Sequence, residues 1–528
     1  MRGASFCLIV LLGALLVPSV VGAAEPVANE AECPEVFFGG LGPVNCFTVA
    51  IPERHEAPDG RHITLFVSIL CSTADDPMPD PVVYLAGGPG SPAAEAASGL
   101  AESMADVRAT RDIILLEQRG TALADPYLGC PALDRHEGFL TAWPEDAETT
   151  KLLIGGAARE CAEAHEAAGT DLSAYSTAQN AADVESVRLG LAIEEWNLYG
   201  TSYGTRLGLE VLRSHPGAVR SAVFDSVYAP GSQLYRDRTP NLARAVAAAT
   251  AACDADAACR ARFGSLNVLL QRALDRWRDT PGEAFVPTGE DSVTPVLIDA
   301  GTVASVVFSQ LVSDPVSLPL ALEALADGRT HVIELSAVVP GLNAEGMRLS
   351  VECAEGFARL DTAAQAAADA EHPDLALAFR SFPEMIACDA WPVSAVDGGV
   401  PEPVASDVPA LLISGAFDPI TPPAAAELAT ETLTDARLYV VPFGGHGAGL
   451  TDPCAIAARD AFFADPADAG PVTCESAGGP FATDVAAHAG AVRAWTEIWL
   501  RTRPWARAPF EAIFGAIGLV CASMVVAI

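Results

Sequence analysis

The stretch that decides the fold runs from Glu194 to Val211 and reads EEWNLYGTSYGTRLGLEV. Residues 196–199 form a short apolar run of strand-forming residues, and the pattern after Gly204 has the spacing of an amphipathic helix. Between them, residues 200–204 have the form G-x-S-x-G. A strand, a tight turn and a helix are the context in which this motif raises a nucleophilic serine above a sheet. The stretch therefore predicts an α/β fold with Ser202 as the candidate nucleophile.

Steric crowding explains why this motif has glycine at its first and last positions. A side chain at Gly200 or Gly204 would collide with the neighbouring strand or helix, because the serine between them sits on a sharp, strained turn. The helix N-terminus then lies beneath Ser202, where its positive end favours an oxyanion. A chance match is the alternative, since the motif is short. The serine also needs a histidine base and an orienting carboxylate, expected in the order Ser, Asp/Glu, His.

Composition limits the possible partners. The 528 residues carry a formal net charge of −37, and Lys151 is the only lysine. A surface this acidic repels phosphate backbones, which argues against a nucleic-acid partner. Half of the residues are apolar, so the chain can bury a large core. The sequence does not indicate an oligomeric state.

The N-terminus indicates export. Residues 1–24 read as a signal peptide, with Arg2, an apolar run over 6–17 and small residues before the cleavage site. Thirteen cysteines in an exported chain predict disulfides. With Cys7 and Cys521 set aside, nearest-neighbour pairing leaves Cys71 over, although sequence alone does not fix the connectivity. The pairs are Cys33–Cys46, Cys130–Cys161, Cys253–Cys259, Cys353–Cys388 and Cys454–Cys474. A zinc site is discounted, because no Cys-x-x-Cys or paired-histidine spacing occurs.

Strands and helices alternate over most of the chain. A helix is expected over 177–191, with Thr177 as its N-cap. Strands are expected at 47–51 and 63–69 (a hairpin), 82–85, 113–116, 196–199, 221–224, 409–413 and 438–441. This alternation predicts a mostly parallel sheet with helices on both faces, the α/β-hydrolase class of fold.

A change in composition divides the chain. Residues 25–230 and 396–508 form the two parts of the expected α/β core. Residues 231–395 are rich in Ala, Leu and Arg with helical periodicity, and predict an inserted helical lid. Residues 509–528 form a hydrophobic tail, in which the uncharged apolar run over 512–528 has about the minimum length for a membrane span. The arginines before it oppose the positive-inside tendency, so a membrane anchor and a buried helix both remain open.

The remaining members of a catalytic triad follow two late strands. Asp418 and His446 each come just after an expected strand, at the sheet edge where Ser202 lies. Asp225 also follows a strand and is the rival acid. Asp418 is favoured because its strand immediately precedes the histidine strand. Two other histidines fit less well: His215, at a helix end before proline, and His488, on a late helix.

A glycine-rich loop follows the strand at 82–85. It reads AGGPGS over residues 86–91. A phosphate-binding loop would need a Lys-Ser/Thr pair or G-x-G-x-x-G, and neither is present. In a serine hydrolase, a backbone N–H from such a loop completes the oxyanion hole, and glycine lets the backbone approach the reacting carbonyl closely. A plain turn is the alternative.

Five stretches together carry a family resemblance: GGPGS (87–91), EQRGT (117–121), WNLYGTSYGTR (196–206), SGAFDPITPP (414–423) and GGHG (444–447). From about residue 33 to residue 500, the chain resembles the prolyl-aminopeptidase and tripeptidyl-aminopeptidase family of secreted α/β-hydrolase serine peptidases. The resemblance implies Ser202 as nucleophile, Asp418 as orienting acid and His446 as base. It also implies oxyanion donors at the backbone of Gly88 and Tyr203. Two positions depart from the family pattern outside the triad, Ala86 and Glu117.

The sequence therefore predicts an exported serine aminopeptidase that acts on peptides through an acyl-enzyme, with no metal and no cofactor. An exopeptidase must recognise a free α-ammonium group, and Glu352 and Glu355 in the expected lid are candidates; ordinary solvated helix carboxylates are the alternative. A carboxylesterase or lipase would use the same triad, because fold does not decide substrate. A hydrolase that has lost activity and serves as a binding protein is the third hypothesis.

Overall fold

The structure is a computed structural model, and it describes residues 26–134, 147–289, 292–330, 343–380, 384–396, 402–467 and 481–483. The expected signal peptide (1–24), the apolar tail (509–528), the late helix that carries His488, and Cys474 lie outside the described residues. Predictions about them therefore stay predictions.

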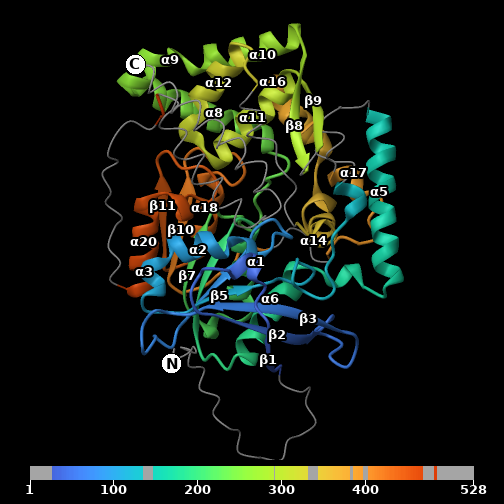
Figure 1. Cartoon of the computed structure of the whole chain (residues 1–528), viewed down its shortest axis with the longest axis vertical. Helices are drawn as coiled ribbons and strands as arrows, with labels where there is room; N and C mark the ends of the chain where they lie inside the picture. The colour runs from blue at the N-terminus through green and yellow to red at the C-terminus, as the bar shows by residue number, and fades with distance from the viewer. Residues whose placement is uncertain are drawn as a thin grey trace, which may run out of the picture.

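A nine-stranded sheet forms the centre of the molecule (Figure 1). Its strand order is β1-β2-β3-β5-β4-β6-β7-β10-β11. The first three strands pair antiparallel, β3 joins β5 antiparallel, and all pairs from β5 to β11 are parallel. The expected strands and the mostly parallel sheet are confirmed. The strands are β1 (Ala28–Ala31), β2 (Val44–Pro52), β3 (His62–Leu70), β4 (Val82–Leu85), β5 (Ile113–Leu116), β6 (Trp196–Thr201), β7 (Val219–Asp225), β10 (Ala410–Gly415) and β11 (Ala436–Val441).

Helices cover both faces of this sheet. On β6, Leu198 packs in a hydrophobic cluster with residues of α6 and α7, whereas Tyr199 packs in a second cluster with residues of α2 and α20. Neighbouring residues of a strand point to opposite faces, so both faces are buried, as a parallel sheet requires. The helices around the sheet are α1 (Glu35–Phe38), α2 (Ala97–Ser103), α3 (Ala105–Arg108), α5 (Ala147–Ala167), α6 (Thr177–Gly190), α7 (Tyr203–Ser214), α18 (Pro423–Thr430), α19 (Ala448–Thr451) and α20 (Pro453–Ala464).

A second body of helices lies at one end of the molecule, at the top of Figure 1. Residues 238–326, here called the cap, supply most of a separate hydrophobic cluster. The region expected to be a helical lid also contains an unforeseen antiparallel hairpin, β8 (Gly282–Gly289) with β9 (Ser292–Ile298). The cap helices are α8 (Arg238–Ala255), α9 (Ala257–Phe263), α10 (Leu266–Asp279), α11 (Ala300–Ser313) and α12 (Leu318–Ala326).

The later part of the expected lid packs differently. Met347 and Leu349 of α14 are buried in the cluster that underlies α6 and α7, so this helix belongs to the core packing. The helices that follow the cap are α14 (Glu345–Glu355), α15 (Thr362–Glu371), α16 (Pro373–Ala376) and α17 (Glu384–Cys388). The sequence did not separate α14 from the cap helices, because a helical pattern continues through both segments.

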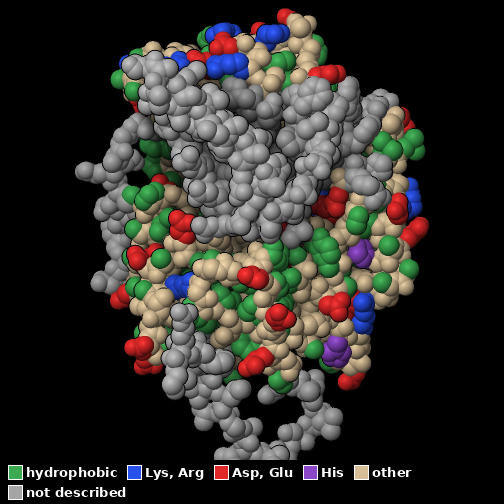
Figure 2. Space-filling view, viewed as in Figure 1, with side chains coloured by type: hydrophobic (Ala, Val, Ile, Leu, Met, Phe, Trp, Pro, Cys, Tyr) green, Lys and Arg blue, Asp and Glu red, His purple; other side chains and the backbone are tan. Residues whose placement is uncertain are grey.

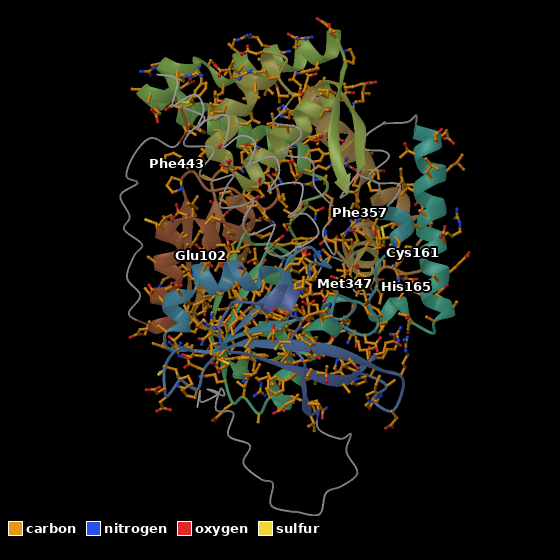
Figure 3. All side chains as sticks on the ribbon, in the orientation of Figure 1. Glu102, Cys161, His165, Met347, Phe357 and Phe443 are labelled. Carbon is orange, nitrogen blue, oxygen red and sulfur yellow. A yellow bond between two sulfur atoms is a disulfide. The ribbon has the colours of Figure 1, made fainter. Side chains whose placement is uncertain are left out.

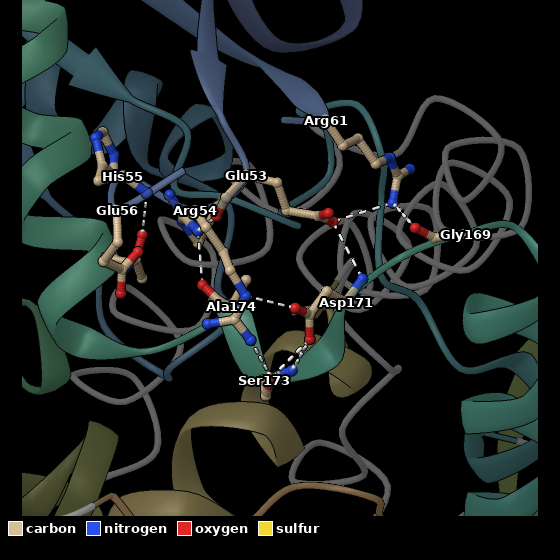
Figure 4. Close-up of polar contacts among 11 residues, drawn as sticks. Glu53, Arg54, His55, Glu56, Arg61, Gly169, Asp171, Ser173 and Ala174 are labelled. Atoms are coloured by element: carbon tan, nitrogen blue, oxygen red, sulfur yellow. Dashed lines mark hydrogen bonds and ion pairs between the residues drawn. The ribbon is translucent and has the colours of Figure 1, made fainter. Parts of the chain in front are cut away.

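A network of hydrogen bonds and ion pairs joins the β2–β3 hairpin to the segment before α6 (Figure 4). Arg54 donates to Asp171 at 2.6 Å, and Arg61 donates to Glu53 at 3.0 Å. Arg119, from the EQRGT stretch, is fully buried and donates twice to Asp183, at 2.8 and 2.6 Å. A buried arginine with two carboxylate bonds is a structural anchor, since an unpaired charge there would be costly.

The N-terminus of α6 differs from the expected one. The N-cap is Ser176, whose side chain accepts from the N–H of Gln179. Thr177 is the first helical residue, and its hydroxyl lies 3.0 Å from the hydroxyl of Tyr203 and donates to Glu355 at 2.7 Å. A serine and a threonine in sequence are equally good caps by composition, and tertiary contacts decide between them.

Four of the expected disulfides are present: Cys33–Cys46, Cys130–Cys161, Cys253–Cys259 and Cys353–Cys388. Cys71 and Cys454 are disulfide-bonded as well, so the expectation that Cys71 is left over is wrong. Acidic side chains are spread over the described part of the face in Figure 2, in keeping with the net charge. Among the described residues, no helix has both the length and the apolar character needed to cross a bilayer.

Candidate active site

Ser202 lies on the sharp turn between β6 and α7, with φ 57° and ψ −122°. Such a conformation is strained for a non-glycine residue and is typical of functional turns. A Cβ on Gly204 would come within 1.9 Å of the carbonyl oxygen of Leu85, and one on Gly200 within 2.5 Å of the Gly204 carbonyl oxygen. The glycines at both positions are therefore required, and the turn has the geometry expected from the sequence.

The glycine loop lies directly against this turn. A Cβ on Gly87 would stand 3.1 Å from the Cβ of Ser202 and 3.6 Å from its Oγ. Gly88 has φ +106°, a conformation that glycine adopts without strain. Within the described residues, the N–H groups of Gly88 and Tyr203 have no hydrogen-bond acceptor. Both are backbone donors beside the serine and are free to bind an anionic oxygen.

Two residues of the EQRGT stretch make hydrogen bonds at the start of this loop and just after its end. Gln118 Nε2 donates to the carbonyl of Ala86 at 2.8 Å, and Glu117 Oε1 accepts from the N–H of Ala94 at 2.7 Å. Burial raises the pKa of Glu117 to about 7. The sequence resemblance marked these residues without explaining them, and their contacts show that they position the glycine loop.

Asp418 and His446 are in direct contact. The Nδ1 atom of His446 lies 2.8 Å from Oδ2 of Asp418. Asp418 is fully buried, and Oδ1 accepts from the N–H groups of Ile420 and Thr421 at 2.7 and 2.9 Å. Burial alone would raise the pKa of Asp418, but His446 and these donors hold it below its ordinary value. Burial would lower the pKa of His446, and Asp418 outweighs it and raises that pKa.

The rival acid, Asp225, faces a different group. Its Oδ2 accepts from the N–H of Gly449 at 3.0 Å, and its backbone oxygen accepts from the N–H of Ser202 at 2.9 Å. It makes no hydrogen bond to the ring of His446, although both residues are described. Burial raises the pKa of Asp225 to about 6. The structure therefore brings Asp418, and not Asp225, against the imidazole.

Ser202 and His446 are both partly exposed, but the structure shows no hydrogen bond between Ser202 Oγ and the imidazole ring. Their loops are joined through the end of β7, where Asp225 holds the serine turn and Ser226 Oγ accepts from the N–H of Gly447 at 2.7 Å. In enzymes without bound substrate, the nucleophile–base contact is often long and shortens in the complex.

The two glutamates of α14 differ in their surroundings. Glu355 accepts from the N–H and hydroxyl of Thr177, at 2.8 and 2.7 Å, and from Arg206 at 2.9 Å. Glu352 is 2% exposed, and burial raises its pKa to about 7. Neither side chain is a solvated helix carboxylate. Glu355 is satisfied by Thr177 and Arg206, whereas Glu352 hydrogen-bonds to Tyr235 and feels the charges of Arg206 and Arg348.

The described residues contain one group with the geometry of a metal site: Cys130, Cys161 and His165. Its two sulfurs are bonded to each other, so neither is a thiolate that could bind a metal. His165 lies on α5 near Cys161 (Figure 3), with its Nε2 3.1 Å from the carbonyl of Gly129. His215 ends α7, where its N–H bonds to the carbonyl of Val211.

Comparison with known families supports the fold. Residues 80–253 match the family model described as alpha/beta hydrolase fold, and residues 379–474 match the model described as TAP-like protein. The first segment carries the glycine loop and the serine turn, and the second carries Asp418 and His446. The chain thus has the α/β-hydrolase fold that the sequence predicts, and both matched segments contribute to the site.

Several curated relatives are similar over about a third of the chain. A probable proline iminopeptidase of Streptomyces coelicolor is 31% identical over 169 residues, which is 32% of this chain and 38% of the relative. A tripeptidyl aminopeptidase of Streptomyces lividans is 29% identical over 197 residues, 36% of each chain. The serine protease Hip1 of Mycobacterium tuberculosis is 26% identical over 198 residues, 35% of this chain and 36% of the relative. The matched part thus spans little more than a third of the length of these relatives.

Among solved structures, a proline iminopeptidase of Mycobacterium smegmatis is 16% identical, with a TM-score of 0.36, and the match covers 79% of this chain and 98% of that one. The α/β hydrolase MGS-M2, from a deep-sea metagenome library, is 11% identical with a TM-score of 0.36, over 76% of this chain and 94% of that one.

Proposed function

We propose that this α/β-hydrolase-fold chain is a serine aminopeptidase, which cleaves one residue or a short unit from peptide N-termini through an acyl-enzyme. The observation that carries the proposal is the contact of His446 Nδ1 with the buried Asp418, at the same sheet edge as the strained Ser202 turn. The similarity to a proline iminopeptidase and a tripeptidyl aminopeptidase supports a peptide substrate.

In the proposed reaction, Ser202 Oγ attacks the scissile carbonyl carbon while His446 Nε2 takes the hydroxyl proton. The oxyanion that forms accepts hydrogen bonds from the N–H groups of Gly88 and Tyr203. His446 then gives its proton to the leaving amine, the C–N bond breaks, and an ester to Ser202 remains. A water molecule that His446 deprotonates then attacks the ester carbonyl. The bond from that carbon to Ser202 Oγ breaks, His446 returns the proton to Oγ, and the new carboxylate is released. Asp418 keeps the imidazole in the required tautomer throughout. These steps need no metal or cofactor.

Recognition of the substrate N-terminus belongs to Glu352 in this proposal. Glu355 already accepts three hydrogen bonds from Thr177 and Arg206, so it has little capacity left for an ammonium group. Glu352 is buried, and its pKa is raised although the charges of Arg206 and Arg348 lower it, so a substrate ammonium would supply a further, direct charge partner. The site then selects a free N-terminus by charge pairing.

Export is part of the proposal. The four disulfides support an oxidising compartment, because cytosolic proteins rarely keep such bonds. Residues 1–24 would act as the signal peptide, and residues 509–528 as a membrane anchor. Fractionation of cells that produce the chain with and without residues 509–528 tests the anchor.

A digest of aminoacyl- and tripeptidyl-anilides tests the activity, with Ser202→Ala as the matched inactive variant. The proposal expects anilide turnover that is lost on N-terminal acetylation of the substrate and lost in Ser202→Ala. Turnover of simple esters with none of any free-N-terminal anilide would instead identify a carboxylesterase. Equal turnover by Ser202→Ala, or no labelling of the wild type by a fluorophosphonate, would refute a serine hydrolase.

A further inference from the structure

The cap and the segment after it are hydrogen-bonded to three loops of the candidate site: the glycine loop, the loop that carries Asp418 (the acid loop) and the loop that carries His446. The N–H of His446 donates to the carbonyl of Val312, at the end of cap helix α11, at 2.9 Å. The N–H of Ala344, just before α14, donates to the carbonyl of Gly90 in the glycine loop at 2.9 Å. The third contact is the one that the cap makes with the acid loop, through Arg244 of α8.

Arg244 spans two carbonyls of the acid loop. Its NH1 atom donates to the carbonyl of Ala416 at 2.7 Å, and its NH2 atom donates to the carbonyl of Asp418 at 2.5 Å. The guanidinium fork suits this arrangement, because its donors have a fixed planar geometry. The side chain is partly buried, and burial lowers the pKa of Arg244 from its ordinary value. A desolvated cation is thereby placed beside the backbone that carries the acid.

Phe417, which lies between Ala416 and Asp418 in the chain, also packs against the cap. Phe417 is 2% exposed and belongs to the hydrophobic cluster of the cap. Its ring centroid lies 6.0 Å from that of Phe443, which follows β11 below the cap (Figure 3), and 6.2 Å from that of Phe481. Consecutive residues thus point in opposite directions: Phe417 into the cap cluster, and Asp418 toward His446.

The charge of Arg244 also lies close to the ionisable groups of the site. Two carboxylates act on His446: Asp418 from the acid loop and Asp225 from the end of β7. Asp225 in turn interacts with Arg459 of α20. Arg244 is a cation of the cap close to this pair, and the charge of Asp418 raises the pKa of Arg244 against the effect of burial. A positive charge here stabilises the carboxylate and opposes protonation of the imidazole.

From these contacts we infer that Arg244 is a positioning residue for the acid–base pair, so that the cap completes the catalytic geometry. The inference rests on the proposed serine hydrolase function. It gives the cap a role in placing Asp418 and His446 that does not require contact between the cap and the substrate. Because this role needs no contact with the substrate, loss of Arg244 should lower the turnover of even the smallest substrates.

The test measures p-nitrophenyl acetate hydrolysis and fluorophosphonate labelling for Arg244→Ala, Arg244→Lys and Arg262→Ala, beside wild type and Ser202→Ala. A small ester reports on the triad without any contribution from peptide recognition. Arg262 is the matched control, because it lies in the same cap and pairs with Glu323 through an exposed bidentate contact, at 2.6 and 2.9 Å.

We expect Arg244→Ala to lower kcat about tenfold or more, since a displaced catalytic group is costly even over short distances. We also expect the acid limb of its kcat/KM profile to move up by roughly 0.5 to 1 pH unit, because the imidazole loses an opposing charge. Arg244→Lys keeps the charge but replaces the planar two-nitrogen fork by a single nitrogen, which fits the two carbonyls less well. It should keep the acid limb in place with an intermediate kcat, and Arg262→Ala should match wild type.

Wild-type kcat with an unmoved acid limb in Arg244→Ala would overturn the inference. So would an equal loss in Arg262→Ala, which would indicate a general effect of the cap charge. If Arg244→Ala fails to fold, Arg244→Lys decides, because wild-type kcat in the lysine variant would overturn a positioning role for the guanidinium fork. Activity that survives in Ser202→Ala would instead refute the proposed function itself.

Discussion

The hydroxyl of Ser226 accepts a hydrogen bond from the N–H of Gly447 at 2.7 Å, which ties the end of β7 to the loop that carries His446. Ser226 is fully buried and has φ 60°, one of three described non-glycine residues with positive φ. Its neighbour Asp225 accepts from the N–H of Ser202 and of Gly449. Asp225 and Ser226 therefore fix the serine turn and the loop that carries His446 relative to each other.

This contact predicts the effect of Ser226→Ala. The change leaves the N–H of Gly447 without its acceptor and loosens the position of the imidazole, so kcat should fall about tenfold with a smaller change in KM. The control is Ser232→Ala, which removes a hydroxyl that donates only to the carbonyl of Ala229. Steady-state kinetics on one anilide substrate measure both. Equal kcat values for the two variants would contradict a role for Ser226 in placing His446.

The choice of acid predicts a clear difference between two Asp→Asn variants. Asp418→Asn should lower kcat by roughly 10³–10⁴, because an amide fixes the wrong tautomer of His446. Asp225→Asn keeps an oxygen acceptor for the N–H of Gly449, and its kcat should stay within about tenfold of wild type. Both variants preserve side-chain volume, so their folded fractions can be matched by circular dichroism before the kinetic comparison. The reverse ranking would make Asp225 the orienting acid.

Glu352 predicts a pH dependence of substrate binding. Its pKa of about 7 means that the carboxylate is present above pH 7 and is lost as the pH falls through that value. KM for a free-N-terminal substrate should therefore rise as the pH falls from 8 to 6, while KM for a small ester should not. Glu352→Gln should raise KM for the peptide substrate and abolish this dependence. Glu355→Gln is the comparison, and it should act mainly on stability, because Glu355 pairs with Arg206.

The sheet and the serine turn could be predicted because they depend on local patterns. Short apolar runs of strand-forming residues, together with Gly200 and Gly204, determine them within a few residues of chain. The hairpin β8–β9 and the core packing of α14 could not, because they depend on which surfaces meet in three dimensions. The same holds for Glu352 and Glu355, which have the same residue type on one helix. Only the three-dimensional structure shows that Thr177 and Arg206 bond directly to Glu355, whereas Glu352 contacts Tyr235.

The buried Glu117 predicts a stability effect with a defined sign. Its folded pKa of about 7 lies above the ordinary value of 4.5, so the folded state binds a proton more tightly than the unfolded state. This contribution is fully present below pH 4.5 and is lost as the pH rises through 7, which destabilises the fold at pH 8. Glu117→Gln keeps an acceptor for Ala94 and carries no charge. Its melting temperature should therefore exceed that of the wild type at pH 8, by a few degrees, and approach it at pH 5. Thermal unfolding at both pH values measures the difference. A lower melting temperature for Glu117→Gln at pH 8 would mean that the ionised carboxylate stabilises the glycine loop.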